Sequence, residues 1–316
     1  MLKGILWAII CVNTCFAQRI DTYSSLAEIP TNSFIRLNYD NDLFRLQDIY
    51  YSQGLTLEIV HPSMKKNPIN HLFLHPIKSD KQKNGVRFES TVYTPSTILS
   101  DSILLNDRSY ASILALEFYE FSYQSIKTMK LISSFQIGII GPAAMGREIQ
   151  TGIHRVTNNS LPLGWQHQIK NDLLLNYNLR VDKQLFHYKT NIALNGIGST
   201  DIGSYQTNFS LGIDLSLGKK NNTFLNNDSK FQAYIYGQSQ IKLIGYDASL
   251  MGGMFHRSSD NTLSYSSISK IVNENHLGIT LLYDSFSFGV DFGWISKEFD
   301  TGSAHSWGGI RIAFGI

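Results

Sequence analysis

The sequence predicts an all-β fold, a 12-stranded antiparallel transmembrane β-barrel with a short helix in an extracellular loop. The first reason is a persistent period of two, in which apolar residues alternate with small or polar ones, as in FSLGIDLSL at 209–217 and FSFGVDFGW at 286–294. The second is composition: aromatic residues make up 12% of the chain, and charged residues only 16%, below the usual quarter. Apolar faces opposite small and polar faces are typical of a barrel with lipid outside and water inside. A soluble lipocalin-like barrel or sandwich is the alternative.

Twelve segments carry the strand pattern, and twelve is an even number, as bacterial single-chain barrels require. A closed barrel is also the β-architecture that leaves no backbone group unpaired in lipid. The predicted strands are 33–42, 50–60, 84–94, 108–122, 127–141, 166–181, 184–197, 204–218, 229–244, 268–283, 285–297 and 304–316.

The connections between these strands should alternate between short periplasmic turns and longer exterior loops. Residues 122–126, 181–183 and 283–285 are predicted as tight periplasmic turns, and 245–265 and the segment after 141 as exterior loops. Two periplasmic connections, 61–84 and 219–228, are longer than this rule predicts. The first is rich in Lys, His and Pro, and nothing in the sequence assigns it a role.

Residues 1–17 have the features of a secretory signal peptide: one lysine, an apolar run from Ile5 to Val12 and a small residue before Gln18. The outer-membrane barrel domain is then residues 18–316. Both cysteines, Cys11 and Cys15, fall in the signal peptide, so the mature chain has no disulfide. The mature part has no apolar run of 18 residues that could form a transmembrane helix, and its near-balanced charge gives no sign of nucleic-acid binding.

The one convincing helix signal lies between Gln136 and Lys170. Pro142 can open a helix without losing a hydrogen bond, and apolar residues then recur at helical spacing at Met145, Ile149, Ile153 and Val156. Gly146, Gln150 and His154 share a different, polar face. The less specific interpretation is a surface loop that happens to fold as a helix.

Topology brings this helix near two other polar groups. If the first strand rises from the periplasm, the Asn41-Asp42 pair lies at its outer end, and 51–54 at the outer start of the second strand. Because His154 is also in an exterior loop, all three groups should meet at the outer rim, in the lipopolysaccharide leaflet.

These stretches resemble the family of outer-membrane lipid A 3′-O-deacylases. The first block is NDLFRLQDIYYSQGL (41–55), and the second is GIIGPAAMGREIQTGIHRVTNNSLPLGWQHQI (138–169). The family pattern is an Asn-Asp pair, D-x-x-Y-[TS]-x-G-L, G-x-x-G-P, Q-x-x-x-H-R and a Trp before a Gln. This chain matches it, in order, at 41–42, Asp48, 51–55, 141–142, Gln150, 154–155, Trp165 and Gln168.

The resemblance implies a calcium-dependent ester hydrolase that releases the 3′-linked acyloxyacyl group of lipid A in the outer leaflet. It implies His154 as the general base that activates water and Gln150 as its catalytic neighbour. Asp42 would be a ligand of Ca²⁺, with Asn41 and Ser52 as further metal-site residues. Imidazole has a pKa suited to such a base near neutral pH, and a hard cation held by oxygen ligands suits a developing oxyanion.

Two other functions fit the sequence less closely. Another outer-membrane esterase, such as a phospholipase, would act on a lipid of the same leaflet with the same kind of metal-assisted mechanism. A non-catalytic porin-like barrel would need no His154. The sequence carries no signal for an oligomeric state.

Overall fold

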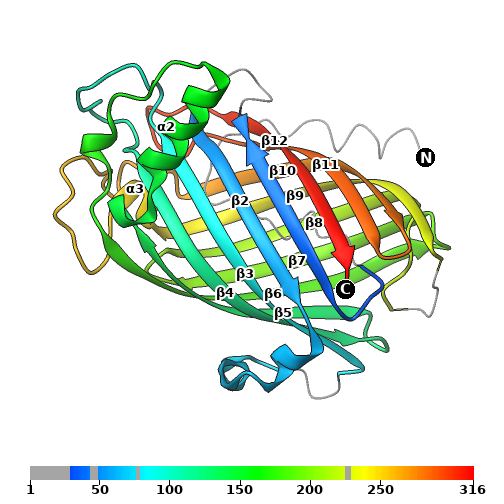
Figure 1. Cartoon of the computed structure of the whole chain (residues 1–316). Coiled ribbons are helices and arrows are strands. Elements are labelled where there is room, and N and C mark those ends of the chain that lie inside the picture. The colour runs from blue at the N-terminus through cyan, green and yellow to red at the C-terminus, as the bar shows by residue number, and fades with distance from the viewer. Residues whose placement is uncertain (1–28, 43–48, 76–78, 225–228) are drawn as a thin grey trace, which may run out of the picture.

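The computed structural model describes residues 29–42, 49–75, 79–224 and 229–316, and within them the predicted barrel is confirmed. Twelve strands form one closed sheet in which each strand pairs with its sequence neighbours (Figure 1). The barrel closes where β1 pairs antiparallel with β12, from Phe34 opposite Gly315 to Asn41 opposite Gly308. The predicted signal peptide, 1–17, lies outside the described residues.

All twelve strands overlap the segments predicted from the period of two; most ends shift by a few residues, and those of β6 and β7 by six to eight. They are β1 (Phe34–Asn41), β2 (Tyr50–Val60), β3 (Lys81–Thr94), β4 (Ala111–Gln124), β5 (Met129–Ile140), β6 (Asp172–Tyr188), β7 (Ile192–Gly203), β8 (Gln206–Lys219), β9 (Phe231–Asp247), β10 (Ile271–Tyr283), β11 (Phe286–Ile295) and β12 (His305–Gly315).

The predicted turn at 181–183 is wrong, because β6 continues through it to Tyr188. Asp182 stays in the sheet with two cations beside it: Lys130 Nζ at 2.8 Å and Arg180 Nε at 2.7 Å. The Val-Asp-Lys triplet that was predicted as a turn is therefore part of a strand. The chain reverses only after Tyr188, where Lys189 has a left-handed φ of 51°.

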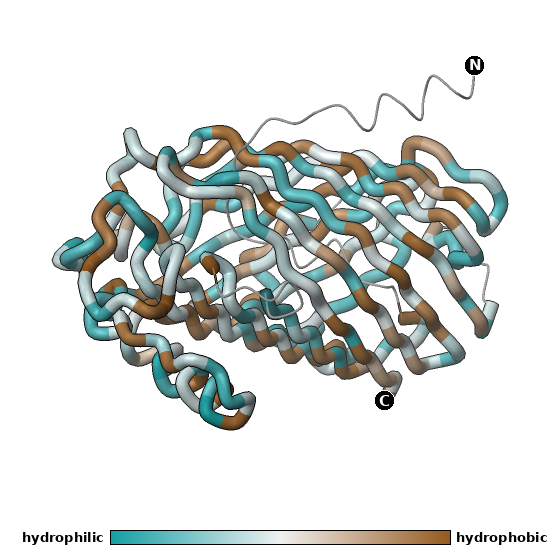
Figure 2. Tube along the Cα trace, turned by 90° about the horizontal axis from the view of Figure 1, so that it is seen from above, coloured by the Kyte–Doolittle hydropathy of each residue, from teal (hydrophilic) through white to brown (hydrophobic). Residues whose placement is uncertain are grey.

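The two faces of the wall differ as a barrel in lipid requires. Ile213 and Phe288 are 46% and 37% exposed, whereas Ser210 and Ser287 are 1% and 5% exposed and face inward. Figure 2 shows the same alternation of hydrophobic and hydrophilic residues along neighbouring strands. None of the helices in the described residues is both long and apolar enough to cross a membrane.

Buried side chains pack inside both ends of the barrel. At one end, a buried cluster that includes Tyr51, Tyr93, Tyr205 and Trp307 draws on most of the strands and on α3 (Ala248–Met251). At the other end, a second buried cluster is built around Phe34, Tyr119 and Phe121. Between them Arg311 donates to the Tyr236 hydroxyl at 2.9 Å, which joins β12 to β9. This contact crosses the interior, because β9 and β12 are not neighbours in the sheet.

The end that carries α2 (Gly146–Thr157) and α3 is the outer end. The connections there include 95–110, 141–171 and 248–270, while the opposite end has the short connections 125–128, 189–191 and 284–285. Long loops are extracellular and short turns periplasmic in outer-membrane barrels. Figure 1 shows the two helices at one end and the C-terminus at the other.

We expect Ile213→Asp to impair assembly far more than Ser210→Asp. Ile213 lies on the lipid-facing stripe, where a charge is costly, whereas Ser210 faces the lumen beside Gln240 Oε1, 3.1 Å away. The fraction of protein that needs heating to unfold on a gel measures correctly closed barrel. Equal loss in both variants would contradict the assigned orientation of β8.

Candidate active site

The helix of the β5–β6 connection is shorter than predicted and begins later. Pro142 opens a 3₁₀ turn, η4 (Pro142–Ala144), and Met145 then has a left-handed φ of 59° that interrupts the helical path. The α-helix α2 follows from Gly146 and ends at Asn158, also left-handed, whose N–H bonds the carbonyl of His154. Asparagine tolerates this conformation well, which makes it a good helix terminator.

Helix α2 lies against the outside of the barrel wall. Leu116 of β4 is 36% exposed on the lipid-facing side, and Ser112, four residues earlier, shares that face. A Cβ on Gly146 would lie 2.4 Å from the Ser112 Cβ, so only glycine allows this approach. Ser112 Oγ also donates to the Ala144 carbonyl at 3.1 Å. These contacts fix the start of α2 on the wall.

The polar face of α2 is the buried one. Gln150 and His154 are 4% and 8% exposed, while Met145 and Val156 are 56% and 89% exposed. The exposed residues of α2 include the charged Arg147, Glu148 and Arg155 as well as Val156. Gln150 and His154 therefore face the barrel wall, while the exposed side of the helix is mixed in character.

A pocket lies between α2 and the outer ends of β1 and β2. The five residues singled out in the sequence, Asn41, Asp42, Ser52, Gln150 and His154, all line it. The pocket encloses about 570 Å³, including its open mouth. The predicted meeting of these groups at the outer rim is therefore confirmed, and 43–48, with Asp48 of the motif, lies outside the described residues.

Backbone irregularities let adjacent residues share this pocket. Asn41 is the last residue of β1. Because Asp42 follows the strand, its side chain need not point to the opposite face of the sheet from that of Asn41. On β2 the register shifts between Tyr51 and Gln53, a β-bulge that lets both Ser52 and Gln53 line the pocket. Tyr51 instead faces the lumen, where its hydroxyl lies 3.3 Å from Asp40 Oδ2.

His154 has a defined tautomer. Its Nδ1 lies 2.5 Å from the Ser160 carbonyl oxygen, and a carbonyl can only accept a hydrogen bond. Nδ1 therefore carries the proton, and Nε2 has the lone pair that a general base needs. Ser160 is two residues beyond the helix end at Asn158, so the turn that ends α2 also orients the imidazole.

Hydrogen bonds hold the other side chains in place. Trp165 Nε1 donates to Gln150 Oε1 at 2.8 Å, so Gln150 presents its NH₂ group on the other side of the amide. The hydroxyls of Ser52 and Thr94 lie 2.7 Å apart. Sequence reasoning missed Thr94, and it missed the pocket-lining residues Tyr39, Gln53, Ile153, Thr157 and Asn159. No short-range pattern marks them, because they meet only through the fold.

The donor atoms at the mouth of the pocket fit a hard cation. Asp42 supplies a carboxylate, Asn41 an amide oxygen and Ser52 a hydroxyl, and oxygen is the ligand that Ca²⁺ prefers. Asp42 is 4% exposed, and its Oδ2 accepts the Ile49 N–H at 2.8 Å. No group of three or more His, Cys, Asp or Glu gathers anywhere in the described residues. A calcium site here would thus combine Asp42 with mainly neutral oxygens.

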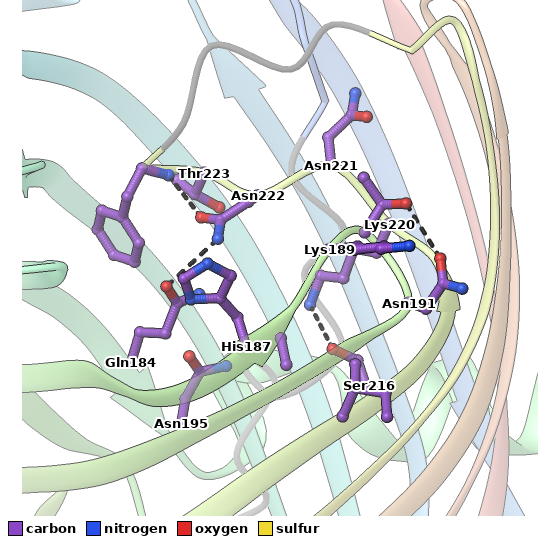
Figure 3. A pocket seen from close by; sticks show the side chains of 14 residues that line it. Gln184, His187, Lys189, Asn191, Asn195, Ser216, Lys220, Asn221, Asn222 and Thr223 are labelled. Atoms are coloured by element: carbon purple, nitrogen blue, oxygen red, sulfur yellow. Dashed lines mark hydrogen bonds between the residues drawn. The ribbon is translucent and has the colours of Figure 1, made fainter.

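A second pocket lies at the opposite, inner end of the barrel (Figure 3). Polar side chains from the ends of β6, β7 and β8 line it, and Asn222 Nδ2 donates to Gln184 Oε1 at 3.3 Å. This pocket shares no residue with the one under α2.

Fold and site together define an outer-membrane β-barrel protein whose candidate active site opens on the lipid-facing wall at the outer leaflet. The family model of the outer membrane protein LpxR matches residues 5–316. The chain therefore belongs to this family of outer-membrane lipid A 3′-O-deacylases, which are ester hydrolases.

Solved structures are similar in fold. LpxR from Salmonella typhimurium is 18% identical, with 90% of this chain and 100% of that chain covered and a TM-score of 0.74. The β domain of the Bordetella autotransporter BrkA is 7% identical over 90% of this chain and 99% of that chain, with a TM-score of 0.46. A search of curated proteins gives no sequence match.

Proposed function

We propose that this protein hydrolyses the 3′-linked acyloxyacyl ester of lipid A with water activated by His154, in a calcium-dependent reaction. The observation that carries the proposal is the position of the pocket, outside the barrel and beneath α2, where His154 and the Asn41-Asp42 pair line one space. A lipid in the outer leaflet can reach this position without entering the barrel.

His154 acts as the general base. Ser160 holds the Nδ1 proton, so Nε2 takes the proton of a water molecule that attacks the ester carbonyl. As the C–O bond breaks, the imidazolium gives the proton to the departing sugar oxygen, which completes hydrolysis to a fatty acid and an alcohol. One residue thus serves as base and then as acid.

Gln150 positions the reacting groups. It lies one helical turn before His154, and Trp165 holds its carbonyl oxygen at 2.8 Å. The Gln150 NH₂ group is then a donor to the attacking water or to the ester. Trp165 is 1% exposed and packs on Tyr110 with ring centroids 4.7 Å apart, so this support is rigid.

Asp42, Asn41 and Ser52 would hold the calcium ion. When bound, Ca²⁺ supplies positive charge where the ester carbonyl oxygen becomes anionic. The Ser52–Thr94 contact and the Ile49 N–H on Asp42 keep the two oxygen ligands from turning away.

The surroundings of the pocket suit a substrate that is part sugar and part hydrocarbon. Ile153 lines the pocket itself, and Ile149 and Val156 extend an apolar flank along α2 toward the bilayer. Arg147 and Arg155 are exposed elsewhere on the helix. The acyl chain would lie along the apolar flank, while the sugar stays at the polar mouth.

The two alternatives predict different products. A phospholipase would use the same pocket but release fatty acid from glycerophospholipids, and a porin would conduct ions while leaving both lipids unchanged. The deciding experiment is mass spectrometry of lipid A and of phospholipids from cells with and without the protein. Loss of the 3′-acyloxyacyl mass from lipid A with unchanged phospholipids is expected. Lysophospholipid with intact lipid A would overturn the proposal.

Trp165→Phe should lower kcat while leaving the barrel intact. Phenylalanine keeps the ring packing on Tyr110 but removes the donor to Gln150 Oε1. We expect a loss of about fivefold, since a single hydrogen bond is worth about 1 kcal/mol. The matched control is Trp294→Phe on the lipid-facing wall, 40% exposed, which should keep full activity. Equal rates in both variants would show that Gln150 needs no support.

A further inference from the structure

The β2–β3 connection, 61–80, is the longest at the inner end of the barrel and takes no part in the site under α2. It begins with two 3₁₀ turns, η2 (Pro62–Lys66) and η3 (Pro68–Leu72). Both are stabilised locally, because Pro stands at the first position of each and His61 and Asn67 cap them. Figure 1 shows this segment outside the barrel wall, at the end opposite α2.

The strands beneath this segment carry a polar row where the lipid-facing band ends. The last apolar row of the band pairs Val86 with Phe118 and Phe118 with Phe135. One step closer to the periplasm, the row on the same face is polar and consists of Asn84, Glu120 and Ser133. These three share the outward face with Phe88, Leu116 and Ile137, which are exposed.

The segment covers this polar row. Asn84, Glu120 and Ser133 are 5%, 3% and 1% exposed although they point outward. His75 Nδ1 lies 2.8 Å from Glu120 Oε1, and the Leu74 N–H donates to Ser133 Oγ at 3.3 Å. Tyr177 anchors the segment further, since its hydroxyl donates to the Leu72 carbonyl at 3.2 Å. The connection is therefore fixed against the outer wall at the level of the inner-leaflet interface.

The exposed side of the segment is basic and apolar. Residues 61–75 contain two lysines, three histidines and no acidic residue. Lys65 and Lys66 are exposed, and within the described part of the chain neither has a carboxylate partner. Leu72 and Leu74 of the same segment are 57% and 56% exposed. Exposed lysines and leucines within one segment at a membrane interface match a phospholipid, with phosphate at the lysines and acyl chains at the leucines.

We propose that residues 61–75 form a binding surface for anionic phospholipid of the inner leaflet. The position follows from the contacts to Glu120 and Ser133, which place the surface directly below the lipid-facing band. The chemistry follows from charge: a segment with only basic groups favours an anionic headgroup over a zwitterionic one. The surface is independent of the hydrolytic site and would anchor the inner end of the barrel.

Native mass spectrometry of the full protein tests the headgroup preference, with phosphatidylglycerol and phosphatidylethanolamine in equal amounts as the probes. We expect retention of phosphatidylglycerol over phosphatidylethanolamine by about tenfold, given two lysines at a membrane surface. Lys65→Gln/Lys66→Gln should lose this preference. The matched control is Lys219→Gln/Lys220→Gln, which removes the same charge at the end of β8 and should keep it. Equal retention of both lipids, or loss in both variants, would overturn the proposal.

A depth measurement tests the position without altering the lysines. With Cys11→Ser and Cys15→Ser the chain has no cysteine, so single spin labels can be placed at will. The accessibility of each spin label to oxygen is measured in phosphatidylglycerol-containing vesicles. The value for Leu74→Cys should lie between that of Leu116→Cys in the lipid-facing band and that of Ile126→Cys in the periplasmic turn. Accessibility of Leu74→Cys equal to that of Ile126→Cys would mean that water or a protein covers this surface.

Discussion

His154→Ala is expected to abolish deacylation while the barrel remains closed. General-base catalysis typically contributes about 10²–10⁴ in rate, and His154 is the imidazole that lines the pocket under α2. The substitution also removes the contact to the Ser160 carbonyl, which lies in a loop and adds little to the stability of the strands. The measurement is the rate of loss of the 3′-acyloxyacyl group from purified lipid A in detergent.

A second histidine in the same loop provides the control. His167 of η5 (Trp165–His167) lies 3.0 Å from the Asp101 carbonyl through Nε2 and does not line the pocket. His167→Ala should keep most of the activity, and both variants should remain heat-modifiable on gels. If His154→Ala retains near-normal activity with confirmed assembly, a base other than His154 must activate the water.

The barrel could be predicted because the same alternation recurs in every strand. Successive side chains of a strand face lipid and lumen in turn, so a stretch such as Phe209–Leu217 indicates a barrel strand by itself. Strand ends are harder to predict, because polar residues suit both a turn and a lumen-facing position. Asp182 illustrates this: its partners Lys130 and Arg180 come from the fold, and they keep it within β6.

The meeting of the candidate site residues in one pocket was predictable, but the geometry of the pocket was not. Order along the chain and the parity of the strands suffice to bring Asn41, Ser52 and His154 to the same rim. The outward position of the pocket depends on the bulge at Tyr51/Gln53 and on the end of β1 at Asn41, neither of which has a local sequence signature. The close approach of α2 to the barrel wall depends on the contact of Gly146 with Ser112 of β4, and these two residues are 34 positions apart in the sequence.

The candidate site and the buried clusters lie on opposite faces of the barrel wall. The clusters around Trp307 and Tyr119 pack inside the barrel, one toward each end. The candidate site residues lie on the outside, where Gln150 and His154 of α2 face the wall. This position places the candidate site next to the bilayer.

Removal of calcium is expected to abolish activity, and Asp42→Asn should raise the calcium concentration needed to restore it. Among the described residues, Asp42 is the one carboxylate that lines the pocket, and affinity for Ca²⁺ falls when a charged ligand is lost. A site with one carboxylate and neutral oxygens should have a dissociation constant on the order of 10⁻⁴ M. Mg²⁺ should restore activity poorly, because it demands near-octahedral geometry.

The choice of asparagine isolates the charge of Asp42. Asn keeps a side-chain oxygen that can accept the Ile49 N–H, now 2.8 Å from Asp42 Oδ2, so the local backbone should hold. The control is Asp260→Asn in the β9–β10 connection, which removes an equal charge from an ion pair with Lys170 at 3.4 Å. Its calcium requirement should match that of the unmodified protein, and His154→Ala should stay inactive at every calcium concentration. Full activity of Asp42→Ala in chelator-treated membranes would remove the metal from the mechanism, and His154 would then have to act on an ester polarised by protein groups alone.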